Sequence, residues 1–345
     1  MKHCLFFISF FLGCIVNAIA QDTIHHRKPL FISKEINRVA KGTLYHYQCR
    51  AFDSSSRSLT YWTQGLPHWL QFNTQNNSLT GKTSQPGQYL IQLYASNGTD
   101  TAKQIFMLTV YDQETTNILC LGNSITNGTN KYNSYRRDLW KLLHRANYNF
   151  DLVGSWSKHH MGGDVPDPDF DMDHDGHSGW TFAEMFQPPS WDSARGNIKE
   201  WLTQYTPDIV LIELGTNDVF QCRKTADMIT DLDKLVKLLR SKKSGVKIFV
   251  AQIPPLGDQW ATKKLCGDSV MYDTRIHQLN KAIAIFVKKV NTSKSPVVAV
   301  DQYTNVTPST MMYDDIHPND AGEKVMAEKW YTAIHGYLKK IKTFP

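Results

Sequence analysis

Two patterns of hydrophobic and polar positions follow one another along this chain of 345 residues. Between residues 22 and 112, apolar and polar positions alternate in short runs separated by turn residues, which is typical of β-strands. The expected strands are residues 43–47, 59–62, 89–95 and 104–110. Their spacing indicates a β-sandwich for this part of the chain.

From residue 116 onward the pattern becomes strand, loop and helix in repetition. The apolar run at 208–214 is nearly continuous, as a strand buried on both faces should be, and the stretches between such runs have helical periodicity. Five such units predict an α/β fold with a doubly wound, flavodoxin-like parallel sheet of five strands. The expected strands are 117–122, 149–154, 208–214, 247–253 and 297–301, and the expected helices are 133–146, 194–205, 225–242, 273–290 and 320–340.

The first twenty residues combine one lysine, an apolar segment and small residues at Ala18 and Ala20. This is the pattern of a secretory signal peptide that is cleaved before Gln21. The apolar run is short for a membrane span and no second one follows, so a secreted protein without a membrane anchor is expected. The expected organisation is a signal peptide at 1–20, a β-sandwich at 21–112 and an α/β domain at 113–345.

Secretion would permit disulfides among the four cysteines that follow the signal segment. Cys120 falls inside an apolar strand, where a buried thiol is expected. Cys222 and Cys266 each follow a strand end, on the same side of the sheet, and are expected to form a disulfide. Cys49 stays unassigned.

Glycosylation and charge add two expectations. The sequence Asn-x-Ser/Thr makes glycosylation candidates of Asn76, Asn97, Asn291 and Asn305, and a glycan at the fifth sequon, Asn127, would crowd the neighbouring Ser124. The formal charge of +6 is mild, and no basic block is interleaved with aromatic residues. A nucleic-acid partner is therefore not expected.

Candidate chemistry begins at the end of the first α/β strand. The apolar run 118–121 is followed by Gly122, Asn123 and Ser124, so a serine stands where the strand ends and a helix begins. Open α/β sheets bind their ligands at this edge. Ser124 is then either a nucleophile or only the cap of the following helix.

A nucleophilic serine needs a base, an acid that orients the base, and donors for the oxyanion. His317 precedes the last expected helix, and Asp314 is close enough in sequence to reach its Nδ1. Gly179 and Asn217 lie in loops where a backbone N–H and a side-chain amide could donate to an oxyanion. The alternatives are that His317 is a surface histidine at a helix start and that Gly179 and Asn217 only shape turns.

An acidic run allows a second interpretation. Aspartates alternate from 167 to 175, as in half of an EF-hand loop, but Phe182 stands where a bidentate glutamate should be. Asp171, Asp173 and Asp175 are therefore weak calcium candidates, and a solvated loop facing the substrate is favoured. Trp156, Trp180 and Trp260 lie in loops and are either a sugar-stacking platform or core residues.

The motifs Gly-x-Ser-x-Thr, Ser-Gly-x-Thr, Gly-Thr-Asn-Asp and Asp-x-x-His, in this order, resemble the four blocks of the SGNH, or GDSL-like, hydrolases. The resemblance covers residues 115–340 and departs from the family at Asn123, where an aspartate is common. By position, the resemblance implies that Ser124 is the nucleophile and that His317 is the base, oriented by Asp314. It also implies three oxyanion donors, which are the backbone N–H groups of Ser124 and Gly179 and the side chain of Asn217.

A narrower resemblance concerns the substrate. Residues 173–181 and 251–255 are similar to stretches of carbohydrate esterase family three, known for acetylxylan esterases. This implies removal of O-acetyl groups from an acetylated polysaccharide or oligosaccharide, without a required cofactor. The alternatives are a lipase or lysophospholipase on the same fold, which the polar loops disfavour, and a non-catalytic surface adhesion protein, which the complete motif set disfavours.

Residues 30–111 also resemble a known module, the cadherin-like, immunoglobulin-type domain found beside secreted enzymes. The resemblance rests on residues 66–72, 79–81, 86–89 and 95–98. The resemblance implies either a module that binds carbohydrate or a partner, or a spacer that packs on the enzyme.

Overall fold

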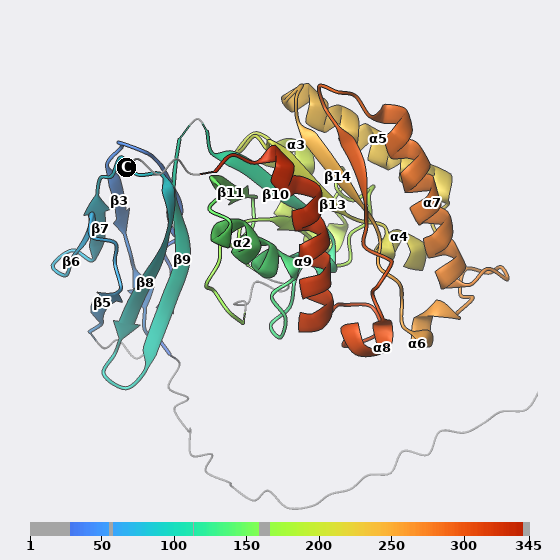
Figure 1. The fold of residues 1–345 in the computed structure, drawn as a ribbon. Coiled ribbons are helices and arrows are strands. Elements are labelled where there is room, and N and C mark those ends of the chain that lie inside the picture. Colours follow the sequence, from blue (N-terminus) through green and yellow to red (C-terminus); the bar gives the residue numbers. More distant parts are fainter. Residues whose placement is uncertain (1–27, 55–57, 113, 159–165, 341–345) are drawn as a thin grey trace, which may run out of the picture.

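The computed structural model describes residues 28–54, 58–112, 114–158 and 166–340. The expected signal peptide lies outside these residues. A β region formed by the N-terminal part of the chain lies beside an α/β region formed by the rest (Figure 1).

The N-terminal region is a β-sandwich, as the alternating pattern predicts. One sheet has the strand order β2-β9-β8-β5 and faces a second sheet with the order β3-β7-β6, while β1 pairs with β4. Side chains from both sheets, among them Tyr47, Leu79, Ile91 and Phe106, form its core. The strands are β1 (Leu30–Phe31), β2 (Arg38–Ala40), β3 (Tyr45–Gln48), β4 (Ala51–Phe52), β5 (Thr60–Gln64), β6 (Leu70–Asn73), β7 (Ser78–Gly81), β8 (Gly87–Ser96) and β9 (Thr101–Tyr111).

The α/β region is built on a parallel sheet with the order β11-β10-β13-β14-β15. This flavodoxin-like order confirms the predicted fold and puts a topological switch point beside β10. A two-residue strand that the sequence does not predict, β12, pairs with the end of β10. The strands are β10 (Thr116–Gly122), β11 (Phe150–Val153), β12 (Asp175–Gly176), β13 (Ile209–Glu213), β14 (Lys247–Gln252) and β15 (Val297–Asp301).

Helices cover both faces of this sheet (Figure 1). Apolar side chains of α5 and α7 pack on one face and those of α2 and α9 on the other, which explains why the central strands are apolar throughout. The helices are α1 (Ser124–Asn127), α2 (Tyr135–Arg145), α3 (Ile198–Trp201), α4 (Thr216–Phe220), α5 (Thr225–Lys242), α6 (Asp258–Ala261), α7 (Tyr272–Val290), α8 (Pro308–Met311) and α9 (Asp320–Ile334).

Two expected helices are shorter than predicted. The stretch 194–205 is interrupted by Gly196, whose φ of 72° is not helical, and Asn197 then caps α3 by accepting from Lys199 N. The stretch 320–340 leaves the α-helix after Ile334 and continues as a 3-10 turn at His335–Tyr337.

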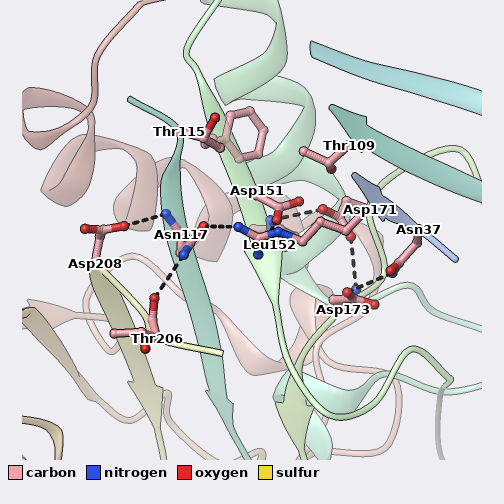
Figure 2. Close-up of polar contacts among 12 residues, drawn as sticks. Asn37, Thr109, Thr115, Asn117, Asp151, Leu152, Asp171, Asp173, Thr206 and Asp208 are labelled. Atoms are coloured by element: carbon pink, nitrogen blue, oxygen red, sulfur yellow. Dashed lines mark hydrogen bonds and ion pairs between the residues drawn. The ribbon is translucent and has the colours of Figure 1, made fainter. Parts of the chain in front are cut away.

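The contact between the two regions combines apolar packing, in which Met107 of β9 joins the core of the α/β region, with a set of polar contacts. Arg38 of β2 forms an ion pair with Asp151 of β11 (Nη1 to Oδ2, 2.7 Å) and donates to Asn117 Oδ1 (2.9 Å). Asn37 Nδ2 donates to Asp173 Oδ2 at 2.8 Å (Figure 2). Burial raises the pKa of the Asp151 carboxyl and raises that of Asp173 to about 8. The β-sandwich thus supplies partners for acidic groups that the α/β region buries.

Cysteine pairing follows the prediction. Cys222 and Cys266 are joined by a disulfide that links the loop before α5 to the loop after α6, with a Cα–Cα distance of 5.4 Å. Cys120 is a buried thiol in β10, and Cys49 is a second buried thiol. Within the described ranges, no helix has both the length and the apolar character needed to cross a membrane.

Candidate active site

Ser124 stands at a sharp turn between β10 and α1. The preceding Asn123 caps the helix through its side chain, which accepts from Ile125 N at 2.8 Å. A Cβ at Gly122 would collide with Thr126 Oγ1 and the Glu213 carbonyl, so only glycine fits the close approach of strand and helix there. The cap interpretation of Ser124 is therefore wrong, and its hydroxyl is left for another partner.

That partner is the predicted histidine. Ser124 Oγ lies 2.8 Å from His317 Nε2, and His317 Nδ1 lies 2.7 Å from Asp314 Oδ2. Burial opposes ionisation of Asp314, but the hydrogen bonds from the His317 side chain and backbone outweigh it, so the pKa of Asp314 lies below its ordinary value. The three side chains form a continuous hydrogen-bonded series with an ionised carboxylate at its end.

The loop that carries His317 is fixed by close backbone packing. Asp315 has a φ of 65°, and Gly257 N donates to its carbonyl at 2.8 Å. A Cβ at Gly257 would collide with the Asp315 side chain. Tyr313 N donates to the His317 carbonyl at 3.0 Å, and the Tyr313 ring stacks on the imidazole. The imidazole is therefore held by its backbone and by a neighbouring ring.

The two predicted oxyanion residues lie on neighbouring segments, Gly179 in a loop and Asn217 in the first turn of α4. Asn217 Nδ2 donates to the Trp180 carbonyl at 2.9 Å, which leaves its second N–H free to point elsewhere. Gly179 has a φ of 83°, and its loop is tied to the end of β10 by His177 N, which donates to Gly122 O at 2.8 Å. Among the described residues, neither Gly179 N–H nor Ser124 N–H has an acceptor.

Glu213, to which no sequence motif assigns a role, lies directly under this turn. Its backbone carbonyl accepts from Asn123 N at 3.2 Å, while neither carboxyl oxygen has a hydrogen-bond partner among the described residues. Full burial raises the pKa of Glu213 to about 8. The sequence does contain a sign of this buried acid, because a glutamate stands inside the otherwise apolar run 209–214.

Replacing Glu213 by glutamine should flatten the dependence of stability on pH. The pKa of Glu213 is raised from 4.5 to about 8 in the folded state. The contribution of the protonated side chain to stability is therefore fully present below pH 4.5 and is lost as the pH rises through about 8. Glu213→Gln cannot ionise, so its melting temperature should exceed that of the wild type increasingly toward pH 8. Glu328→Gln, an exposed change on α9, is the control. Parallel pH curves for Glu213→Gln and the wild type would contradict the assigned ionisation.

The calcium candidates are occupied by protein hydrogen bonds. Asp171 Oδ2 accepts from Leu152 N at 3.0 Å, Asp173 Oδ2 accepts from Asn37, and Asp175 Oδ1 accepts from Ser155 Oγ at 2.5 Å. No group of three His, Cys, Asp or Glu side chains in the described part of the chain could hold a metal ion. The favoured alternative, a solvated loop, is wrong for Asp171 and Asp175, which are buried, whereas Asp167 at the start of the acidic run is exposed.

The three tryptophans proposed for stacking differ in burial. Trp180 is fully buried, so the core interpretation holds for it and the platform interpretation is wrong for it. Trp156 and Trp260 are half-buried: the Arg195 guanidinium lies 3.5 Å over the Trp156 ring, and Trp260 packs edge to face against Phe220.

The glycosylation candidates differ in exposure. Asn76, Asn291 and Asn305 are exposed. Asn97 is buried and its Nδ2 donates to Asp53 Oδ2 at 3.2 Å, so the folded chain leaves no room for a glycan there. Asn127 is likewise buried beside the site.

Two of the cavities among the described residues lie away from Ser124. The larger, of about 820 Å³, lies between the two regions and is lined by residues that include Phe31, Lys34 and Trp156. The smaller, of about 90 Å³, lies near Gln88 and Asn147. Neither includes Ser124, Asn217 or His317.

Two family profiles match the chain. Residues 120–325 match the GDSL-like Lipase/Acylhydrolase family, and residues 28–111 match an Ig domain. The first range spans the serine, both oxyanion candidates and the histidine.

Individual proteins are similar over about two thirds of this chain. A multidomain esterase of Ruminococcus flavefaciens is 32% identical over an alignment of 240 residues that covers 65% of this chain and 29% of that protein. A family 3 carbohydrate esterase from Talaromyces cellulolyticus is 28% identical with a TM-score of 0.51, covering 64% of this chain and 97% of the other. A family 3 carbohydrate esterase of Clostridium thermocellum is also 28% identical, with a TM-score of 0.50, covering 65% and 96%. The chain spans less than two thirds of the length of its curated relatives.

Proposed function

This chain belongs to the GDSL-like lipase/acylhydrolase family, and from that membership and the geometry around Ser124 we propose that it is a secreted serine esterase that removes O-acetyl groups from a carbohydrate. The observation that carries the proposal is the hydrogen-bonded series of Ser124, His317 and Asp314, with distances of 2.8 and 2.7 Å. A serine hydroxyl within this distance of an oriented imidazole can be activated as a nucleophile.

The proposed reaction begins when Ser124 Oγ attacks the acetyl carbonyl carbon while His317 Nε2 accepts the hydroxyl proton. Asp314 keeps the other proton on Nδ1 and stabilises the imidazolium that forms. The negative oxygen receives hydrogen bonds from Ser124 N–H, Gly179 N–H and the free amide N–H of Asn217. His317 then protonates the departing sugar oxygen, and an acetyl-serine ester remains.

Water completes the cycle. His317 takes a proton from the water, whose oxygen attacks the acetyl-serine carbonyl, and the same donors stabilise the second tetrahedral intermediate. Its collapse releases acetate and returns the proton to Ser124. Every proton and acyl transfer is thus assigned to residues of this chain.

The substrate class is supported by the similarity to the family 3 carbohydrate esterases, at 28% identity over nearly their whole length. Secretion is supported by the Cys222–Cys266 disulfide, since disulfides persist in oxidising compartments.

The proposal is tested by measuring free acid released from acetylated xylan, mannan, pectin and chitin oligomers, and from long-chain 4-nitrophenyl esters. Acetate release from at least one acetylated saccharide, with little cleavage of long-chain esters, is expected. Preference for long acyl chains would replace the proposed substrate by a lipid.

Replacing Asn217 by alanine should lower kcat by roughly 10²–10³-fold, because one oxyanion donor is lost while the nucleophile and base remain. KM should change little, since the donor acts mainly on charge that develops during the reaction. Steady-state kinetics with 4-nitrophenyl acetate measure both constants. Gln221→Ala, an exposed change at the end of the same helix, is the control. An Asn217→Ala enzyme with unchanged kcat would remove Asn217 from the oxyanion hole.

A further inference from the structure

Trp191 is the most exposed tryptophan among the described residues, with 65% of its surface open to solvent. The next is Trp62 of the β-sandwich at 39%, whose ring stacks on Tyr94. A single exposed apolar side chain is ordinary on a protein surface. Trp191 becomes informative through its position, because its ring lies against the glycine that the proposed function uses as an oxyanion donor.

The contact with Gly179 is close. A Cβ placed at Gly179 would lie 3.4 Å from Trp191 Cη2 and 3.6 Å from Cζ2. The φ of 83° at Gly179 also disfavours any side chain there. The indole therefore lies against the bare backbone of Gly179, the residue whose N–H the proposed function uses as an oxyanion donor.

The segment that carries Trp191 is anchored through the next residue, Asp192. Trp191 lies in the 3-10 helix Ser190–Arg195, which follows Pro189. Trp180 Nε1 donates to Asp192 Oδ2 at 3.1 Å, and Arg195 Nε pairs with Asp192 Oδ1 at 3.2 Å. The exposed ring is thus carried by a segment that is already anchored, which lowers the entropy lost when a ligand binds.

We propose that Trp191 is a stacking subsite for the pyranose ring that bears the acetyl ester. The inference rests on the proposed function and names a residue that determines its specificity. The face of an indole is electronegative, and the face of a pyranose presents weakly positive C–H groups, so the two stack while the sugar hydroxyls stay hydrated. A fatty acyl chain would instead need an enclosed apolar pocket, which a ring with this exposure does not provide.

The test compares Trp191→Ala and Trp191→Phe with the wild type on two substrates, an acetylated xylo-oligosaccharide and 4-nitrophenyl acetate. Loss of the ring should lower kcat/KM for the oligosaccharide by about 10- to 100-fold, corresponding to one buried aromatic contact, and mainly through KM. Phenylalanine should restore part of this loss. Activity on 4-nitrophenyl acetate and the melting temperature should stay unchanged. Trp62→Ala, the other exposed tryptophan, is the matched control and should leave both activities intact.

The outcomes separate the subsite from the proposed function. An unchanged kcat/KM for the oligosaccharide in Trp191→Ala would overturn the subsite alone. An equal loss on both substrates would also overturn it, because the ring would then only support the backbone of Gly179. A wild-type enzyme that cleaves 4-nitrophenyl acetate but no acetylated saccharide would overturn both the proposed substrate and the subsite.

Discussion

Replacing Ser124 by alanine should lower kcat for acetate release by about 10⁶-fold, to near the detection limit, because without the hydroxyl no acyl-enzyme can form. The side chain is small and half-buried at a helix start that Asn123 caps, so the fold should be retained. Acetate release and circular dichroism measure the two effects. Ser190→Ala, an exposed serine near Trp191, should retain full activity.

The base provides an internal check on this result. If Ser124 and His317 act as a unit, His317→Ala should lower kcat about as much as Ser124→Ala does. The double variant should then have a kcat no lower than that of either single variant. Substantial turnover by the purified Ser124→Ala enzyme would assign the nucleophile to another residue.

Replacing Asp314 by asparagine should lower kcat by about 10⁴-fold, the size of effect known for this change in a serine triad. An amide N–H facing Nδ1 would favour the imidazole tautomer with its proton on Nε2, which cannot accept a proton from Ser124. The pKa of Asp314 lies below its ordinary value, so the wild-type carboxylate is charged at neutral pH and the comparison can be made there.

The control for Asp314→Asn is Asp320→Asn, an exposed carboxylate at the start of α9. It changes the net charge equally and leaves the Nδ1 contact intact, so its kcat should match the wild type. A loss of less than tenfold in Asp314→Asn would mean that the imidazole is oriented by its backbone and Tyr313 alone.

Features determined by neighbours in sequence could be predicted. The apolar runs of β10 and β13 identify strands buried on both faces, and the strand-loop-helix repetition then leaves few topologies. Asp314 and His317 lie three residues apart, so their contact is local. The convergence of Ser124 with His317 followed from a rule about sheet edges, since both follow strands of one parallel sheet.

Features determined by distant partners could not be predicted. Asp173 looks solvated in the sequence but is paired with Asn37, 136 residues away. Trp156 looks free for a ligand but is covered by Arg195. Helix α3 begins only at Ile198 because a single glycine, Gly196, adopts a positive φ, which the helical periodicity of the sequence does not reveal.

The ion pair between Arg38 and Asp151 bears on how this protein can be divided or recombined. A fragment that starts at β10 would keep Asp151 and Asp171 but lose Arg38, along with Gln88, whose Nε2 lies 3.4 Å from Asp171 Oδ2. The carboxylates of Asp151 and Asp171, which are now enclosed, would then face water without their partners and repel one another. The parallel sheet would thereby be destabilised. A fragment that folds on its own should therefore include the β-sandwich with Arg38, and a foreign sandwich grafted in its place would need a cation at the position of Arg38.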